Sequence, residues 1–278
     1  MTSRPSSPIV LFVLLSAAPL AYSQEEPYRS PYRVEFSYPR EELLGDMEGR
    51  RGDHRLEAEI PFHEWYSRRT LERWRSWGPP AAYYPPVPGI EKWPVERQRE
   101  RVVALAMRFQ GYAYQHHHIP DWNPPRHWPW SESCARSNGK GVDCSNLTGF
   151  VYNLGFGLRL NTDVHAQSQE RVARGPGERT TRLNLVELPQ GYEERIEALR
   201  TGDLLFIRER GGKISHVVIW VGPIGRAPDG VPLVLDSHGA DTRDSDGHVI
   251  PCGVHLRPFR KTSWYNMSAS HALRILRD

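Results

Sequence analysis

One stretch decides how this chain folds: GVDCSNLTGFVYNL, residues 141–154. Its apolar residues recur every third or fourth position, which is the spacing of one helix face; they are Leu147, Phe150, Val151 and Leu154. Asp143 is a favourable N-cap, and Gly155 and Gly157 are favourable residues for a helix end. We therefore predict a helix that begins at Cys144 and buries one apolar stripe.

The predicted helix places Cys144 in its first turn. Backbone N–H groups in that turn have no acceptor within the helix, and the positive end of the helix dipole lies beside them, so an anion is favoured there. A thiolate is such an anion, and it is the form of cysteine that attacks as a nucleophile. The same N–H groups suit the oxyanion that forms on attack. Cys144 is therefore the candidate nucleophile.

The segments after this helix have the character of strands. They are short, rich in branched or aromatic residues and separated by glycine, proline or aspartate; they cover residues 204–207, 217–221, 233–235 and 254–259. Another helix is predicted upstream, where Val102, Val103, Ala106 and Phe109 recur at helical spacing. Helices followed by strands predict an α+β fold in which N-terminal helices pack on an antiparallel sheet.

Two histidines lie at the ends of neighbouring predicted strands. His216 immediately precedes the strand at residues 217–221, and His238 ends the next strand along the chain. Because neighbouring strands bring such residues side by side, we predict that His216 is the general base for Cys144 and that His238 orients it. A single cysteine or histidine is more often structural. The prediction depends on the order of all three residues.

The order of several segments resembles that of the NlpC-type cell-wall cysteine peptidases, a papain-like family. Residues 141–147 resemble the nucleophile motif, which usually reads Asp-Cys-Ser-Gly. The other matching segments are residues 111–114 (a Gly-x-Pro-Tyr entry), 199–206 (a Pro-Gly-Asp-Leu strand entry), 215–220 (a His-Val-Gly-Ile-Tyr strand) and 236–239 (a third polar site). The resemblance extends over about residues 102–259.

The resemblance implies a papain-like fold and a role for each matching residue. Cys144 would be the nucleophile, His216 the base and His238 the orienting residue. Near the scissile amide, the residues that would contact the substrate are Tyr114, Asp143 and Ser145. The substrates would be peptidoglycan stem peptides or muropeptides, often cleaved after D-glutamate, and the reaction would need no cofactor.

Two residues depart from the family pattern. Asn146 stands where the nucleophile motif has glycine, and Val218 replaces the glycine of the histidine strand. Glycine lets the backbone approach a ligand or partner closely, so larger side chains narrow or reshape the cleft. The loop at residues 115–140 is also unusually long for the family. These departures leave the scissile bond open.

The N-terminal part of the chain has a different composition. Residues 1–23 have the features of a secretory signal peptide, and their apolar run is too short to cross a bilayer. We therefore expect an exported protein, periplasmic or extracellular, without stable membrane insertion. Residues 24–95 are rich in proline, tyrosine and arginine, which predicts an arm with one short helix ending at Gly78. Residues 96–278 are the predicted catalytic domain.

Export affects how the other cysteines are interpreted, because pairs of cysteines tend to oxidise outside the cytoplasm. With Cys144 as nucleophile, Cys134 and Cys252 remain either as a disulfide or as free thiols. A histidine-rich loop contains residue types that bind zinc; they are His116, His117, His118, Asp121 and His127. Adjacent histidines do not converge easily on one ion. We predict no metal site and expect this loop to border the cleft.

The charge pattern argues against one class of function. The net charge is +3, and the basic residues are scattered among acids, which is not typical of a dedicated nucleic-acid binder. The leading hypothesis is an exported cysteine peptidase or amidase that forms an acyl-enzyme on Cys144. The alternatives are an acyltransferase that uses the same triad, a non-catalytic cell-wall-binding module and a metal-dependent hydrolase.

Overall fold

The computed structural model describes residues 28–48, 64, 67–75, 83–115, 128–130, 141–177, 179–244 and 246–277. The helix predicted to carry the nucleophile forms as α4 (Cys144–Phe156), with Asp143 as its N-cap and a left-handed Gly157 (φ 67°) at its end. The upstream helix forms as α3 (Val95–Met107) and follows Pro94. Proline is tolerated at a helix start because its missing N–H would have no acceptor there.

One antiparallel sheet dominates the second half of the chain. Its strand order is β10-β7-β6-β5-β11-β4, and β1 pairs with β6 outside this path. The strands are β1 (Arg33–Val34), β4 (Asn184–Glu187), β5 (Leu204–Arg208), β6 (Ile214–Arg226), β7 (Pro232–His238), β10 (Gly253–Pro258) and β11 (Ala269–Arg274). The four predicted strands correspond to β5, β6, β7 and β10. The sequence pattern did not indicate β4 and β11.

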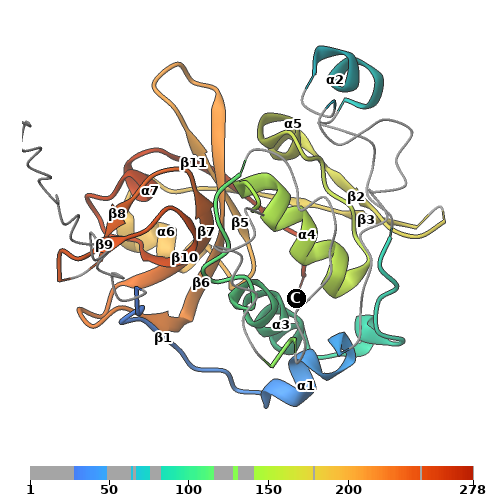
Figure 1. Cartoon of the computed structure of the whole chain (residues 1–278), viewed down its shortest axis with the longest axis horizontal. Coiled ribbons are helices and arrows are strands. Elements are labelled where there is room, and N and C mark those ends of the chain that lie inside the picture. Colours follow the sequence, from blue (N-terminus) through green and yellow to red (C-terminus); the bar gives the residue numbers. More distant parts are fainter. Residues whose placement is uncertain are drawn as a thin grey trace, which may run out of the picture.

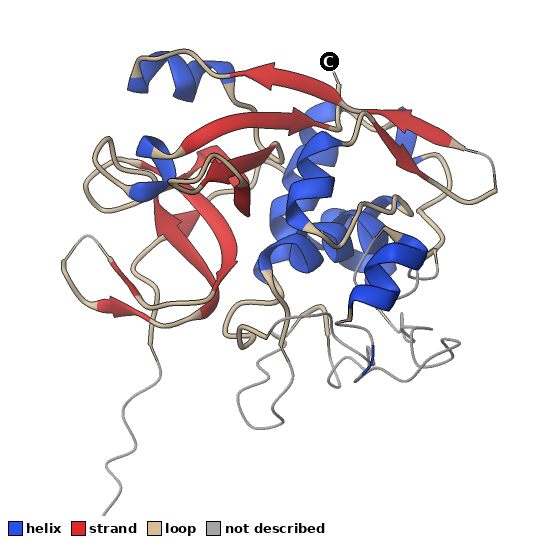
Figure 2. Cartoon of the chain, turned by 90° about the horizontal axis from the view of Figure 1, so that it is seen from above, coloured by secondary structure: helices blue, strands red, loops and turns tan. Residues whose placement is uncertain are grey.

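Side chains of the sheet alternate between two apolar layers, as successive strand residues must. On β5, Leu204 and Phe206 join the layer packed against α3 and α4, whereas Leu205 and Ile207 join the layer on the other face. Figure 1 shows α3 and α4 together on one side of the sheet, with α6 (Tyr192–Ala198) and α7 (Trp264–Met267) on the other. The view in Figure 2 shows the longer helices gathered beside the strands. The predicted α+β fold class is confirmed.

Part of the segment before α3 packs into the same core. The helix α1 (Arg40–Leu44) contacts α3 and buries Leu43 and Leu44 completely. Arg101 of α3 is also fully buried, and its Nη1 lies 2.6 Å from Oδ1 of Asp46. A buried guanidinium needs such a partner, because an unpaired charge inside a protein is costly. Residues 28–48 are therefore anchored on the main folded unit by apolar contacts and by an ion pair.

The remaining elements are short. They are the 3-10 helices Gly45–Met47 and Ile90–Lys92, the helices α2 (Arg68–Trp74) and α5 (Val164–Gln169), and the strands β2 (Val172–Arg174), β3 (Thr180–Arg182), β8 (Thr242–Arg243) and β9 (Val249–Ile250). The helix expected in the arm is α2. It ends before Arg75, which adopts a left-handed conformation (φ 54°), and not at Gly78. No helix in the described part of the chain combines the length and the apolar character that a bilayer span requires.

Candidate active site

The start of α4 is closed by a side-chain cap. Oδ1 of Asp143 accepts hydrogen bonds from the backbone N–H of Asn146 at 2.9 Å and from its side-chain amide at 2.7 Å. Asn146, the residue that replaces the glycine of the family motif, therefore strengthens the cap. The cap fixes Cys144 in the first helical turn, where the residue is 5% exposed.

His216 on β6 joins Cys144 to a carboxylate. Its Nε2 lies 2.6 Å from Oδ2 of Asp236 on β7. The same ring is hydrogen-bonded to the side chain of Cys144. Because Nε2 is occupied by Asp236, Nδ1 is the nitrogen left for the thiol. Cysteine, histidine and aspartate thus form one continuous chain of polar contacts.

Asp236 is the centre of a buried network. Its side chain is fully buried and accepts hydrogen bonds from Nε of Arg257 at 2.9 Å and from the hydroxyl of Tyr265 at 3.0 Å, in addition to its contact with His216. Burial alone would raise the pKa of Asp236, but the charges of Arg257 and His216 outweigh it and hold the pKa below its ordinary value. The carboxylate therefore stays ionised.

The protonation of His216 reflects its two negative neighbours. Burial lowers the pKa of the imidazole, but the charge of Cys144 and the hydrogen bond with Asp236 outweigh this effect. The net result is a rise in the pKa from 6.5 to about 10. An adjacent imidazolium is one of the known means of stabilising a reactive thiolate. At neutral pH His216 is therefore protonated, and its positive charge lies beside the side chain of the candidate nucleophile.

His238 does not have the orienting position predicted for it. Its ring lies edge-on to His216, with centroids 5.3 Å apart, and its Nδ1 lies 2.7 Å from the carbonyl oxygen of Ala240. Residues two apart on a strand share a face, so Asp236 and His238 both point toward His216. The carboxylate of Asp236 is the group that makes the hydrogen bond. The predicted role of His238 is therefore corrected, and the orienting position belongs to Asp236.

Sequence reasoning also missed the supports of Asp236. Arg257 is fully buried on β10, and Tyr265 is buried in α7. A signal for this network was present, since Asp236 and Arg257 each directly follow a leucine in neighbouring predicted strands. Charged residues are almost never fully buried unless they are paired. Two opposite charges on neighbouring predicted strands could have been matched to each other.

A pocket of about 240 Å³ opens beside the thiol. The predicted substrate contacts Tyr114, Asp143 and Ser145 line it together with Cys144. The hydroxyl of Ser145 donates to the carbonyl of Thr162 at 2.7 Å, which ties the helix start to the next wall of the pocket. The other lining residues are Asp163, Val164, Glu209, Lys213, Ile214 and Ser215. The structure thus brings the predicted nucleophile and the predicted substrate contacts to one cavity.

The predictions on the other cysteines and on the histidine-rich loop are only partly covered by the structure. Cys252 is exposed and has a free thiol, whereas Cys134 lies outside the described residues, so their pairing stays a prediction. The loop residues His116, His117, His118, Asp121 and His127 also lie outside the described residues.

A different group could hold a metal ion. Its members are Asp244, Asp246 and His248, whose ligand atoms lie within 4.8 Å of one another. However, Oδ1 of Asp244 already accepts the backbone N–H groups of Asp246 and His248. These bonds explain the arrangement as a turn.

A cysteine at a helix start, facing a histidine on an antiparallel strand, is the arrangement of a papain-like cysteine site. Residues 129–237 match the model of the NlpC/P60 family, and this range contains Cys144, His216 and Asp236. The match agrees with the resemblance in the sequence motifs: over these residues the chain is similar to the NlpC/P60 family.

Other comparisons add little. No match is found among curated proteins. Similar solved structures include an NlpC/P60 family protein from Bacillus cereus (19% identity, TM-score 0.38, covering 64% of this chain and 40% of that one). Another is NlpC1 from Trichomonas vaginalis (15% identity, TM-score 0.37, covering 65% of this chain and 45% of that one). The chain thus spans less than half the length of either.

Proposed function

We propose that this protein is an exported cysteine peptidase or amidase that hydrolyses amide bonds in peptidoglycan stem peptides. The observation that carries the proposal is the chain of contacts from Cys144 through His216 to Asp236. At its Cys144 end this chain reaches a pocket. The carboxylate is sealed from solvent, whereas the thiol lies at the pocket wall. This is the arrangement that an activated nucleophile needs.

Acylation is the first half of the proposed reaction. The Cys144 thiolate attacks the carbonyl carbon of the amide, and a C–S bond forms. The resulting oxyanion is stabilised by backbone N–H groups in the first turn of α4, which have no acceptor within the helix. The imidazolium of His216 then gives its proton to the leaving nitrogen, the C–N bond breaks and a thioester remains on Cys144.

Deacylation restores the site. His216, now neutral, takes a proton from a water molecule that attacks the thioester carbonyl. The C–S bond breaks, a carboxylic acid leaves and the thiolate is regenerated beside the imidazolium. Asp236 stays ionised throughout because the charge of Arg257 lowers its pKa. The carboxylate holds His216 in one orientation and stabilises its positive charge.

The substrate class and the location belong to the same proposal. The NlpC/P60 match supports a peptidase or amidase that acts on cell-wall peptides. The motif resemblance favours the amide bond after D-glutamate as the bond that is cleaved. The signal-peptide features of residues 1–23 support export to the periplasm or the extracellular space.

Digestion of purified muropeptides with product masses as readout tests the proposal. Wild-type protein should release fragments that have gained one water for each bond cleaved. Cys144→Ala should release none, and the matched control Cys252→Ser should keep full activity because that thiol is exposed and lies outside the site. Undiminished release by Cys144→Ala would refute the mechanism.

The alternatives give different outcomes in the same assay. Added amine acceptors would appear in the product masses if the enzyme transferred acyl groups. Loss of activity on chelation would indicate a metal-dependent hydrolase. Binding to cell walls without any fragment release would indicate a binding module.

A further inference from the structure

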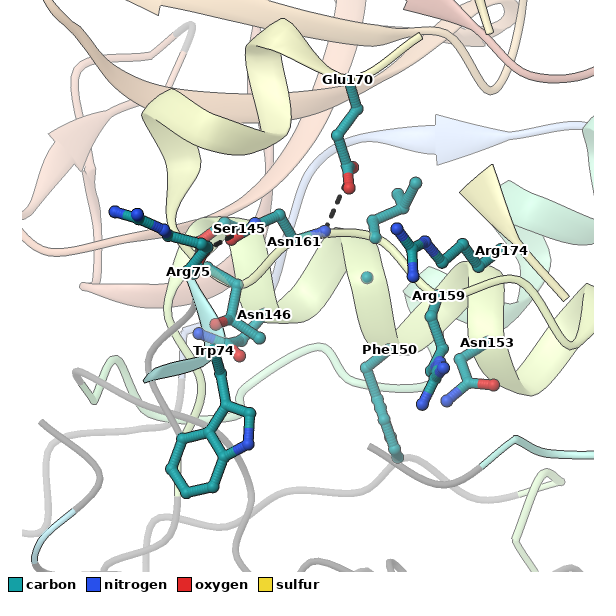
Figure 3. Close-up of a pocket in the computed structure, with 13 residues that line it drawn as sticks. Trp74, Arg75, Ser145, Asn146, Phe150, Asn153, Arg159, Asn161, Glu170 and Arg174 are labelled. Carbon is teal, nitrogen blue, oxygen red and sulfur yellow. Dashed lines mark hydrogen bonds between the residues drawn. The ribbon is translucent and has the colours of Figure 1, made fainter. Parts of the chain in front are cut away.

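Two further pockets adjoin the catalytic pair, and the reaction described above gives neither of them a role. One lies along α4, has a volume of about 340 Å³ and shares Ser145 and Thr162 with the pocket beside Cys144. Figure 3 shows Ser145 at one end of this pocket and Arg159 and Arg174 at the other. The pocket along α4 therefore extends away from the helix start on the side of Cys144.

The other pocket lies on the side of His216. Its volume is about 460 Å³, and its walls include the rings of His238 and Trp264. The centroids of these two rings lie 5.3 and 5.4 Å from that of His216. Gly239 follows His238 and lies against Tyr114, a residue of the pocket beside the thiol, since a Cβ at Gly239 would be 3.2 Å from the Tyr114 ring. This pocket and the pocket beside the thiol are therefore neighbours, with His216 between them.

The proposed reaction assigns the two sides of the catalytic pair to different parts of a peptide. The carbonyl carbon stays on Cys144 in the acyl-enzyme, whereas the leaving nitrogen receives its proton from His216. The acyl part must therefore lie on the Cys144 side and the leaving part on the His216 side. Because hydrolysis of a peptide releases its C-terminal part as the amine, the leaving part also carries the C-terminal carboxylate.

Trp264 offers a surface for contact with such a leaving part. The residue is 40% exposed, although its ring packs on His216 and lines the pocket. Aromatic side chains bury a large area when a partner covers them, and they contribute strongly to binding. A peptide that extends past His216 would therefore gain contacts with the exposed part of the Trp264 ring.

The charge of this pocket is favourable for a carboxylate. The described residues that line it include no acid but three arginines. Arg257 and Arg260 each have a carboxylate partner, at 2.9 and 3.6 Å. Arg243 has no such partner among the described residues, and its Nη1 donates to the neutral carbonyl group of Gly247 at 2.7 Å. A guanidinium group has five N–H donors in a fork that matches the two oxygens of a carboxylate, so Arg243 has donors left for a ligand.

We propose that the pocket beside His216 is the subsite for the leaving part of the peptide, in which Trp264 packs on the leaving residue and Arg243 binds the C-terminal carboxylate. The inference rests on the proposed function, because the occupant is a part of the substrate. A volume of about 460 Å³ is that of a small-ligand site, so the subsite favours short leaving segments. Trp264 and Arg243 are thus specificity-determining residues on the side of the leaving group.

Calorimetric binding to the full-length Cys144→Ala protein tests the subsite without any turnover. The probes are two short muropeptides that differ only at the C-terminal end of the stem peptide, a free carboxylate in one and a carboxamide in the other. The carboxylate form should bind about tenfold more tightly, since hydrogen bonds to charged groups are among the stronger ones. Adding Arg243→Gln should remove that preference.

Lys261→Gln is the matched control for the lost charge, because Lys261 is exposed between β10 and α7 but does not line the pocket. It should preserve the preference for the carboxylate form. Equal affinities for the two peptides, or a preference that survives Arg243→Gln, would overturn the subsite.

A comparison of leaving groups separates substrate binding by Trp264 from mere support of His216. The substrates are a stem peptide and the primary amide of the same acyl part, whose leaving group is ammonia and does not reach Trp264. Trp264→Ala should lower kcat/KM about tenfold more for the peptide than for the primary amide. The control Met267→Ala removes a more exposed side chain of the same helix outside the pocket and should lower kcat/KM equally little for both. Equal losses for both substrates in Trp264→Ala would overturn the subsite.

Failure of the subsite and failure of the proposed function give different results. A preference for the carboxylate form that depends on Arg243, together with no hydrolysis by wild-type protein, would refute the peptidase function and leave a carboxylate-binding pocket. Hydrolysis by wild-type protein with equal affinities for the two muropeptides would overturn the subsite and leave the peptidase function standing.

Discussion

The two sides of the Cys144–His216 pair differ in their access to solvent. On one side, Asp236 and Arg257 are fully buried and hydrogen-bonded to each other. On the other, the thiol faces a pocket that continues into the arginine-lined pocket along α4. The sealed side sets the charge and orientation of the imidazole, and the open side receives the substrate. Changes on the sealed side should therefore affect catalysis for every substrate.

Replacing Asp236 should cause the largest loss. We expect Asp236→Ala to lower kcat by about 10³-fold or more, because His216 would lose both its orientation and the charge that stabilises its protonated form. The matched variant His238→Ala should lower kcat by less than about tenfold, since that ring only lies edge-on to His216. Steady-state rates on muropeptides, with circular dichroism to verify folding, would measure both. Similar losses in the two variants would restore His238 to the orienting role.

Arg257→Leu should destabilise the fold. The variant leaves the buried Asp236 carboxylate without the guanidinium that balances it beside His216, and breaking a buried ion pair from one side costs about 3–5 kcal/mol. Urea unfolding would measure the loss. The control Arg243→Leu removes an exposed arginine that lines the adjacent pocket, and it should change stability by less than about 0.5 kcal/mol. If both variants lower the free energy of unfolding by the same amount, the network around Asp236 does not depend on this ion pair.

The pH dependence should follow His216. Its pKa is raised from 6.5 to about 10, so kcat/KM should fall as the pH rises through about 10 and the leaving nitrogen loses its proton donor. Because the folded pKa is raised, the associated stability is fully present below pH 6.5 and is lost between pH 6.5 and about 10. Asp236→Asn should move the alkaline fall in kcat/KM to lower pH. An unchanged profile in that variant would show that Asp236 does not act on His216.

Asn146→Gly should have the smallest effect. The variant restores the glycine of the family motif but removes the amide that donates to Asp143 at 2.7 Å. We expect a loss of about 1 to 2 kcal/mol in the free energy of unfolding, from the missing hydrogen bond and from glycine in a helix. Thermal unfolding would measure it. A more stable variant would mean that Asn146 is retained for a reason other than the cap.

The sequence predicted the parts of the site that depend on local interactions. The N-cap of Asp143 and the apolar spacing of α4 are encoded within a few residues, so the position of Cys144 could be predicted. The choice between Asp236 and His238 could not, because it depends on which of two side chains on the same face reaches His216. The sheet neighbours β4 and β11 were missed for a similar reason: their pairing joins residues far apart in the chain.

The alkylation rate of Cys144 by iodoacetamide tests the central claim most directly, because it requires no substrate. The measurement uses protein with Cys134→Ser and Cys252→Ser, so that one thiol remains, and compares it at neutral pH with the same protein carrying His216→Ala. We predict rapid alkylation in the first protein and a rate at least about tenfold lower in the second, since His216 stabilises the thiolate. Equal rates in the two proteins would contradict the assignment of Cys144 and His216 as a catalytic pair.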